Sequence, residues 1–241
     1  MMDKTLASPA TAVAGIFDGA TVMISGFGGS GAPIELIHAL IDRFRATGHP
    51  GRLTVVNNNA GNGHVGLAAL IKAGMVTKLI CSFPRSADPV VFTEMYLAGK
   101  IEPELVPQGT LAERIRAGGA GIPAFYTPTG YGTDLAAGKK IEAFDGRPYV
   151  QERWLKADFA LVKAHRGDRL GNLTYRAAGR NFGPLMCMAA AVAIVQVSEL
   201  VAPGGIDPEA VITPGIFVQG LVEVPDPAQE ELRNRAGAHY A

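Results

Sequence analysis

Cysteine is scarce in this sequence of 241 residues, and its two cysteines are not spaced as ligands. Cys81 and Cys187 lie far apart in apolar runs, without CxxC or mixed Cys/His spacing. Such residues are typical of buried thiols in a reducing compartment. We therefore expect no redox or zinc role for them, and a cytoplasmic location for the protein.

An excess of charge of either sign is also absent. The 22 Lys and Arg residues balance the 22 Asp and Glu residues, so no overall field attracts nucleic acid or an anionic membrane. The most apolar run, residues 185–195, is about half the ~20 residues that a membrane helix needs. It predicts a core helix that continues into a core strand. The first five residues lack the apolar stretch of a secretory signal, so we expect no export.

Common catalytic signatures are missing as well. The sequence has no HExxH motif, no Gly-Lys-Ser/Thr after a glycine loop and no Ser-His-Asp arrangement. Glu35 falls in the first turn of a predicted helix, where a carboxylate suits the helix dipole, and we interpret it and Glu199 as structural. We predict no bound metal, because metal spacing is absent from the scattered His38, His49, His64, His165 and His239.

What is present is a series of short apolar strands that alternate with helices, in a chain with 48% apolar residues. This alternation predicts an α/β fold with a mainly parallel open sheet flanked by helices. We expect one domain over residues 1–225 and a flexible tail over residues 226–241. Helices are expected from Ile34, near residues 67–71 and 91–96, and from about Pro184. Strands are expected at residues 21–24, 53–56, 78–81, 104–106, 159–163, 191–197 and 216–224.

Two segments do not fit this alternation. Residues 118–132 are rich in glycine, proline and aromatic residues. They predict an ordered loop that lies against another surface, because they are too apolar for a disordered linker. Asp145-Gly146, between the apolar residues 141–144 and 147–150, is typical of a two-residue β-hairpin. We expect this hairpin to decorate an edge of the fold.

Near the N-terminus, a short apolar run breaks into glycines and then into a helix. Thr21 to Ile24 have the character of a buried strand, and Pro33 suits the first turn of a helix. Glycines between them let a ligand approach N–H groups at a helix N-terminus, which suits a phosphate. The alternative is a turn that is glycine-rich only because it packs tightly. The residues concerned are Ser25, Gly26, Phe27, Gly28, Gly29, Ser30 and Gly31.

Polar residues follow three other predicted strands. Asn57, Asn58 and Asn59 come directly after the second strand, Arg85 comes soon after the third, and Gln108 soon after the fourth. Ligands of parallel sheets bind outside the carboxyl ends of the strands. We therefore expect these residues and the glycine loop to share one crevice.

Several stretches resemble signatures of the A subunit of family I coenzyme A transferases. The family form of the glycine loop has two glycines before the phenylalanine, whereas this chain has Ser25-Gly26-Phe27. The resemblance covers nearly the whole chain. Its other stretches are Asn57-Asn58-Asn59-Ala60-Gly61-Asn62-Gly63, residues 106–116 (which begin Val106-Pro107-Gln108-Gly109), Thr127-Pro128-Thr129-Gly130-Tyr131-Gly132-Thr133 and Gly171-Asn172-Leu173-Thr174-Tyr175-Arg176.

This resemblance implies a two-subunit enzyme that moves CoA from succinyl-CoA to a 3-oxo acid, with no permanently bound cofactor. In the family, a glutamate in a Ser-Glu-Asn-Gly motif of the B subunit forms an acyl anhydride and then a glutamyl-CoA thioester. This chain has only Ser198-Glu199-Leu200. A B subunit is therefore implied as the partner, in a heterotetramer of two A and two B subunits. Residues 118–132 are our candidate for the contact with it.

The resemblance also implies roles for the crevice residues. Asn58 and Gln108 would donate hydrogen bonds to an oxyanion near the thioester, and the glycine loop would contact the CoA phosphates. The alternatives are a turn built from the asparagines and a loop braced by Gln108. Arg85 would bind the second carboxylate of 3-oxoadipate. Its alternative is a surface arginine bound to water or to Asp88.

Three stretches, residues 62–70, 81–86 and 213–219, look most like those of 3-oxoadipate CoA-transferases of the β-ketoadipate pathway of aromatic compound catabolism. Enzymes of the family that use acetoacetate are the alternative. A non-catalytic nucleotide-binding module is an alternative from another class of protein. A dinucleotide site expects an acidic residue at the end of the second strand, and asparagines stand there instead.

Overall fold

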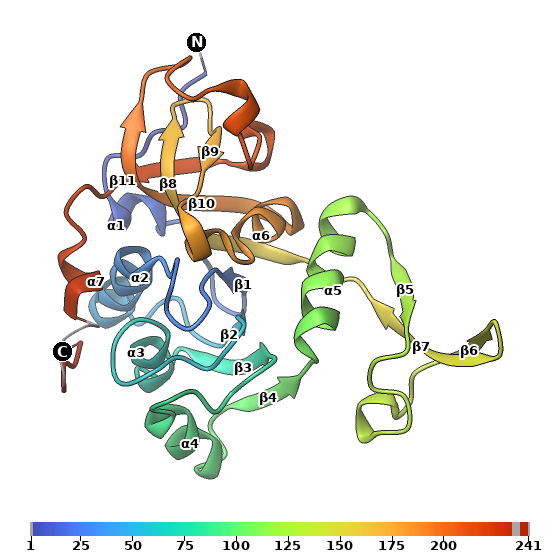
Figure 1. Cartoon of the computed structure of the whole chain (residues 1–241). Helices are drawn as coiled ribbons and strands as arrows, with labels where there is room; N and C mark the ends of the chain where they lie inside the picture. Colours follow the sequence, from blue (N-terminus) through green and yellow to red (C-terminus); the bar gives the residue numbers. More distant parts are fainter. Residues whose placement is uncertain (1, 233–236, 241) are drawn as a thin grey trace.

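The computed structural model describes residues 2–232 and 237–240 (Figure 1). Within them, the main sheet has the order β11-β10-β8-β1-β2-β3-β4, with β9 added to β8. All pairs in that order are parallel, and only the β8–β9 pair is antiparallel. The mainly parallel sheet is thus confirmed. Its strands are β1 (Thr21–Ile24), β2 (Leu53–Val56), β3 (Val76–Cys81), β4 (Glu102–Leu105), β8 (Ala157–Asp168), β9 (Leu173–Thr174), β10 (Ala190–Val201) and β11 (Gly220–Glu223).

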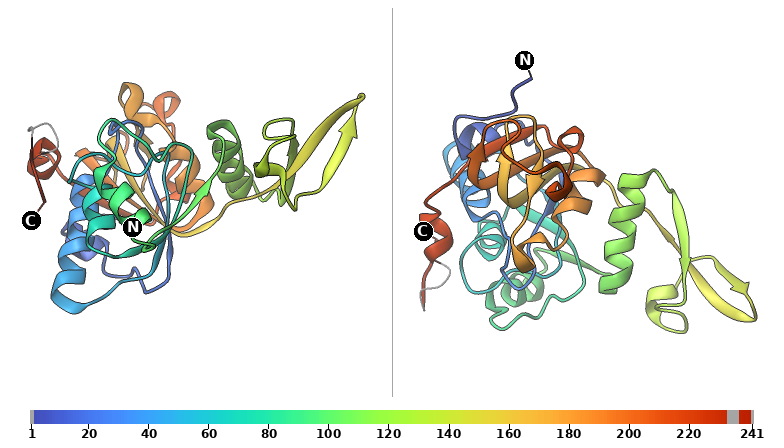
Figure 2. Two further views of the ribbon diagram at one scale, coloured as in Figure 1. Left: turned by 90° about the horizontal axis from the view of Figure 1, so that it is seen from below. Right: turned by 45° about the horizontal axis from the view of Figure 1, so that its top comes forward.

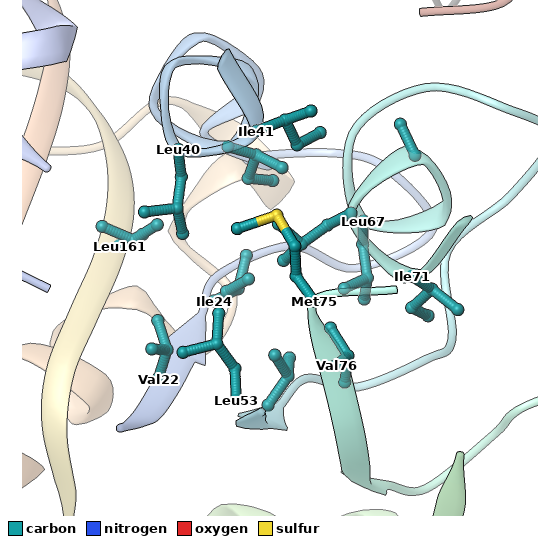
Figure 3. Packing of buried hydrophobic residues seen from close by; sticks show 14 of the residues in the cluster. Val22, Ile24, Leu40, Ile41, Leu53, Leu67, Ile71, Met75, Val76 and Leu161 are labelled. Atoms are coloured by element: carbon teal, nitrogen blue, oxygen red, sulfur yellow. The ribbon is translucent and has the colours of Figure 1, made fainter. Parts of the chain in front are cut away.

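Helices cover both faces of this sheet. Successive strand residues point to opposite sides, so each face carries apolar side chains that a helix layer buries. Val22 and Ile24 of β1 pack with residues of the first four helices, whereas Met23 packs with α5 and α6. Figure 3 shows the first of these layers, where Leu40, Ile41 and other side chains meet the sheet. The helices are α1 (Pro9–Ala12), α2 (Ile34–Thr47), α3 (Leu67–Lys72), α4 (Val90–Leu97), α5 (Gln108–Ala120), α6 (Gly183–Ala189) and α7 (Ala228–Leu232).

Strand order reverses direction at β1. The chain runs outward from β1 through β2, β3 and β4 on one side, and β8, β10 and β11 lie on the other. A ligand crevice in such a sheet lies outside the carboxyl ends of the strands at this point. The glycine loop directly follows β1, so the topology places it at the switch point.

A second, three-stranded antiparallel sheet projects from the body as an arm (Figures 1 and 2). It contains β5 (Ala124–Thr127), β6 (Ile141–Phe144) and β7 (Arg147–Arg153), in the order β5-β7-β6. The hairpin at Asp145-Gly146 is confirmed, and the two residues have positive φ angles of 51° and 74°. We call residues 121–153 the arm.

The irregular loop expected over residues 118–132 is wrong in part. Residues 118–120 belong to α5, and residues 124–127 form β5 of the arm. Gly118 and Gly119 remain helical because their lack of a side chain permits close packing: a Cβ at Gly118 would lie 2.2 Å from the carbonyl oxygen of Leu155, and one at Gly119 would lie 2.6 Å from the Cβ of Met188.

The strand expected over residues 216–224 is also shorter than predicted. Residues Gly215–Phe217 form a 3-10 turn, and β11 begins only at Gly220. Gly215 packs tightly, since a Cβ there would lie 2.3 Å from the carbonyl oxygen of Leu170. Ile216 is consequently directed to the surface and is 77% exposed.

The C-terminal segment makes specific contacts along α2. Glu230 N–H donates to Glu35 Oε1 at 3.0 Å, and Tyr240 stacks on His38 with 3.6 Å between ring centroids. The Tyr240 hydroxyl donates to the Asp42 carboxylate at 2.7 Å. Residues 233–236 and 241 lie outside the described residues. Flexibility of the tail therefore stays a prediction. No helix in the described part of the chain is long and apolar enough to cross a membrane.

Candidate active site at the carboxyl edge of the sheet

The glycine loop, residues 25–31, is folded back on itself. The backbone N–H groups of Phe27 and Ser30 each donate to the other residue's carbonyl at 3.0 Å. The buried Ser25 hydroxyl donates to the Gly31 carbonyl at 2.7 Å and accepts from Lys163 N–H at 3.1 Å. Glycine is required here because the φ angles at positions 26, 28, 29 and 31 range from 58° to 135°.

Asn181 holds this loop from outside. Its Oδ1 accepts from Gly26 N–H at 3.0 Å, and its Nδ2 donates to the carbonyl of Ser30 at 3.1 Å and to that of Gly179 at 2.9 Å. The backbone of Asn181 has φ 25° and ψ −125°, an uncommon conformation for a residue with a side chain. A Cβ at Gly31 would lie 2.5 Å from Asn181 Nδ2, so this close contact also requires glycine at position 31.

Asn181 is not among the site residues that the sequence predicts. It lies just beyond the signature that ends at Arg176, and its partner Gly26 is far away in the chain. The local signal was an asparagine that follows Gly179 and Arg180 directly before a helix. Such a residue is typical of a turn, and only the tertiary structure reveals its second role.

Two of the predicted catalytic residues are brought into contact. Gln108 Nε2 donates to Asn58 Oδ1 at 2.8 Å, and the Ser82 hydroxyl donates to the same oxygen at 2.8 Å. Asn58 is 5% exposed and follows β2, whereas Gln108 begins α5 after β4. Asn58 Nδ2 and the second hydrogen of Gln108 Nε2 have no acceptor among the described residues. They remain available as donors.

The neighbouring asparagines supply the turn that was the alternative interpretation. Asn57 Oδ1 accepts from Asn59 N–H, and Asn59 Oδ1 accepts from Gly61 N–H, each at 2.9 Å. These are local Asx turns. Asn57 Nδ2 also donates to the Ile24 carbonyl at 2.7 Å and so ties β2 to β1. Because its neighbours stabilise the turn, the side chain of Asn58 is free to bond across the site.

Two cavities flank the glycine loop. The smaller one, about 160 Å³, lies between the loop, the asparagine turn and Ser86. The larger one, about 660 Å³, lies on the other side of the loop, where Lys163 and Arg176 contribute to its lining. Gly28 borders both cavities. The glycine loop therefore separates two spaces that could each receive part of an elongated ligand.

Arg85 is exposed in a loop that is anchored on both sides. The Ser86 hydroxyl donates to the Gly61 carbonyl at 2.6 Å, and Asp88 N–H donates to Asn62 Oδ1 at 2.7 Å. The Arg85 guanidinium makes no hydrogen bond or ion pair within the described residues, so the expected alternative partner, Asp88, does not hold it. Its side chain is available to an incoming anion.

The groups interpreted as structural have structural partners. Glu35 is buried, and its carboxylate accepts from Gln196 Nε2 at 2.8 Å, whereas Glu199 pairs with Arg166 at 3.0 Å. Cys81 and Cys187 are buried free thiols, and burial raises the pKa of each to about 12. Neither is a thiolate at neutral pH, so neither is poised as a nucleophile. The described residues contain no cluster of three His, Cys, Asp or Glu side chains that could hold a metal ion.

Comparison with known proteins identifies the class to which this edge of the sheet belongs. The family model for coenzyme A transferase matches residues 6–224. The chain therefore belongs to the coenzyme A transferase family. It is 60% identical over 232 residues to the A subunit of 3-oxoadipate CoA-transferase from Pseudomonas putida, covering 96% of this chain and 98% of that protein. It is 59% identical over 224 residues to the subunit of the same name in Acinetobacter baylyi, covering 93% and 96%.

Solved structures agree on the fold. An acyl-CoA transferase apoenzyme from Escherichia coli O157:H7 superposes with a TM-score of 0.83 at 24% identity, covering 94% of this chain. This chain spans about half of that one, since it covers 48% of it. Glutaconate coenzyme A-transferase from Acidaminococcus fermentans has a TM-score of 0.80 at 18% identity, covering 94% of this chain and 77% of that one.

Proposed function

We propose that this chain is the A subunit of a 3-oxoadipate CoA-transferase, which transfers CoA from succinyl-CoA to 3-oxoadipate. The observation that carries this function is the identity of 60% and 59% to two subunits of that name, over nearly the full length of each. Relatives that are named as A subunits of succinyl-CoA:3-ketoacid coenzyme A transferase are 44% to 49% identical. Acetoacetate is therefore the second candidate acceptor.

The amide pair at the sheet edge supports this chemistry. Each acyl transfer forms a tetrahedral oxyanion, which needs donors that are already in place. Asn58 Oδ1 is fixed by Gln108 and Ser82, each at 2.8 Å, so the orientation of the Asn58 amide is set before substrate binds. Its Nδ2 then points its hydrogens away from those partners. We assign Asn58 and Gln108 as oxyanion donors.

The nucleophile of the proposed reaction would come from the partner. Glu35 and Glu199 both have structural partners, so neither fits the role of the glutamate that forms the anhydride and thioester. We propose that the B subunit supplies it, in a cytoplasmic complex of two A and two B subunits that uses CoA and succinyl-CoA as substrates and needs no permanently bound cofactor.

The glycine loop is proposed to contact CoA phosphates through its backbone. The N–H groups of Gly28 and Gly31 have no acceptor among the described residues, whereas those of Gly26, Phe27 and Ser30 are used to hold the loop together. Backbone N–H groups beside a helix N-terminus suit a phosphate. The loop thus combines a rigid frame with donors that a ligand can use.

The decisive experiment is a transfer assay on the purified complex of the A and B subunits. With succinyl-CoA as donor, kcat/KM should be higher for 3-oxoadipate than for acetoacetate. A preference for acetoacetate would assign the chain to the second candidate. Failure to transfer CoA to either acid would remove the proposed function.

A further inference from the structure

The larger cavity beside the glycine loop has an unusual distribution of charge. Lys163 and Arg176 contribute cationic side chains to its lining, and among the described residues Glu230 is the only acidic one there. Its volume of about 660 Å³ lies within the ~300–1,000 Å³ typical of small-molecule sites. The active-site amides Asn58 and Gln108 are not part of this lining. Those amides do not line the smaller cavity either, and the two cavities share only Gly28 of the glycine loop. The larger cavity is therefore a space of its own beside the loop.

Lys163 is fixed to the glycine loop through its backbone. It lies on β8 beside β1, and its N–H donates to Ser25 Oγ at 3.1 Å. Its side chain is 20% exposed, and its ammonium group forms an ion pair with the Glu230 carboxylate. Arg176 lies in the loop after β9 and also lines the cavity, and its guanidinium has no partner among the described residues. Two cations thus accompany one carboxylate.

Glu230 reaches this cavity from a separate element, the C-terminal helix α7. In Figure 1, α7 lies beside α2, and the Glu230 N–H donates to Glu35 Oε1 at 3.0 Å. The neighbouring Gln229 Oε1 bonds to His38 Nδ1 at 3.2 Å. These contacts fix α7 where the Glu230 side chain can reach Lys163. The carboxylate that neutralises the site therefore belongs to a short segment at the end of the chain and not to the sheet.

We propose that Lys163 and Arg176 bind a phosphate group of coenzyme A in this cavity, and that Glu230 neutralises Lys163 when no coenzyme is bound. This inference rests on the proposed function. A phosphate carries more negative charge and more acceptor oxygens than a carboxylate, so it can replace Glu230 at Lys163. The displaced carboxylate then lies near an anion, which favours a shift of α7 away from the cavity. Glu230 acts as a competitor of the coenzyme.

The test is calorimetric titration of the A–B complex with CoA, for the wild type and two variants. Lys163→Met should weaken CoA binding about tenfold or more, because a charge-assisted bond to phosphate is lost. Glu230→Gln should strengthen CoA binding roughly two- to tenfold, because it removes the competitor. The matched controls are Lys100→Met and Glu231→Gln, which change residues outside the cavity. Both controls should bind CoA as the wild type does.

Two further ligands identify the group that is bound. Dephospho-CoA lacks the 3′-phosphate, so a Lys163→Met effect that is lost with it would assign Lys163 to that phosphate, and an unchanged effect would assign it to the pyrophosphate. Inorganic phosphate serves as the control for a free anion. If it binds the wild type as tightly as CoA does and with the same dependence on Lys163, the site is a simple phosphate site and the inference is wrong.

If Lys163→Met fails to fold, Glu230→Gln still tests the inference. Glu230 lies on a peripheral helix, so this variant is expected to fold. CoA binding unchanged in Glu230→Gln would overturn the competitor role, and unchanged binding in a folded Lys163→Met would overturn the site. Either result, with normal transfer by the wild-type complex, leaves the proposed function intact. A wild-type complex that neither binds CoA nor transfers it would remove both.

Discussion

The carboxyl edge of the main sheet is organised by contacts within this chain, whereas the arm leaves apolar side chains exposed. At the sheet edge, the buried side chain of Asn58 is bonded to the half-buried Ser82 and to Gln108, which is exposed. In the arm, apolar side chains remain exposed: Ile141 is 42% exposed and Phe144 is 43% exposed. One region is organised before any partner arrives. The other displays surface that a partner could cover.

This contrast has an energetic basis. A buried amide must be bonded to compensate for its loss of water, so the sheet edge can be rigid without help. The arm has little interior of its own. Its main cluster is Phe144 against Tyr126 and Tyr149, at centroid distances of 5.1 and 5.5 Å. The difference suggests that the chain supplies a prepared half of the active site and a surface for its partner.

The largest expected effect concerns the whole chain. The A subunit purified without its partner should be folded but should not transfer CoA, because it has the donors, whereas Glu35 and Glu199 are held by structural partners. Activity should appear on mixing with the B subunit. The measurement is CoA transfer from succinyl-CoA by either subunit on its own and by the mixture. Transfer at a normal rate by this chain without its partner would show that the sheet edge is a complete active site.

Next in size is the effect of the amide pair. Gln108→Ala and Asn58→Ala should each lower kcat about 100-fold, or ~2 kcal/mol or more, because an oxyanion donor acts on the chemical step. Assembly of the complex should be unchanged. Gln151→Ala is the matched control, since this amide lies in the arm and bonds to the Tyr126 hydroxyl. Wild-type kcat in either active-site variant would remove that residue from its role.

Arg85 tests whether the sheet edge also selects the substrate. Arg85→Met should lower kcat/KM for 3-oxoadipate about ten- to a hundredfold, because a charge-assisted bond of roughly 1.5–3 kcal/mol to its second carboxylate is lost. Acetoacetate lacks that carboxylate and should be barely affected. The measurement is kcat/KM for both acids with succinyl-CoA. An equal fall for both would assign Arg85 to CoA or to structure, and no fall for either would leave it a surface residue.

The arm should respond in association and not in chemistry. Ile141→Asp should weaken the binding of this chain to its partner about tenfold, because a charge would be buried in an apolar contact. Leu97→Asp is the matched control, since Leu97 is 78% exposed on α4 in the body. The measurement is the Kd of the two subunits. A Kd unchanged by Ile141→Asp, or equally changed by both variants, would show that the arm is not the contact surface.

The smallest expected effect is a pH dependence of stability that arises in the body and not in the arm. Burial lowers the pKa of His38 to about 4 from 6.5, against the weaker opposing influence of the Gln229 hydrogen bond and Asp42. Well above pH 6.5 the imidazole is neutral in both states. Below it, the unfolded chain binds a proton that the folded chain excludes, so the free energy of unfolding should fall by about 1 kcal/mol between pH 6.5 and 5.5.

Urea unfolding of the wild type and of His38→Gln at the two pH values measures this contribution. The fall should be smaller in the variant by that amount, because the other titrating groups are common to both proteins. Equal pH dependence in the two proteins would contradict it. Tyr240, which stacks on His38, belongs to the body, so the arm should not take part in this change.

Local pattern was sufficient for elements whose reasons are local. Thr21–Ile24, Leu53–Val56 and the Asp145-Gly146 hairpin have the predicted positions, because β-branched runs and turn residues determine them. Asn58 and Gln108 were also correctly expected close together, since the carboxyl ends of parallel strands meet at one edge, but neither lines the cavities beside the glycine loop.

What the sequence could not reveal depends on close approach between distant segments. Gly118 looks like a helix breaker, yet it lies within α5 because Leu155 packs where a side chain would be. Asn181 looks like a turn residue, yet it bonds to Gly26 and Ser30. Glu230 falls in a segment that was expected to be flexible. In each case the partner is far away in the chain, and no local sequence pattern predicts the contact.

The central position of β1 has a consequence for how the protein is made. Val22 pairs with Val55 on one edge of β1 and with Phe159 on the other. A ribosome that has released β1 to β4 must still synthesise α5 and the whole arm before β8 can form. Until then, one edge of β1 presents unpaired N–H and C=O groups, which can pair with another nascent chain. Co-translational folding of this protein should therefore require protection of the first half of the sheet by a chaperone.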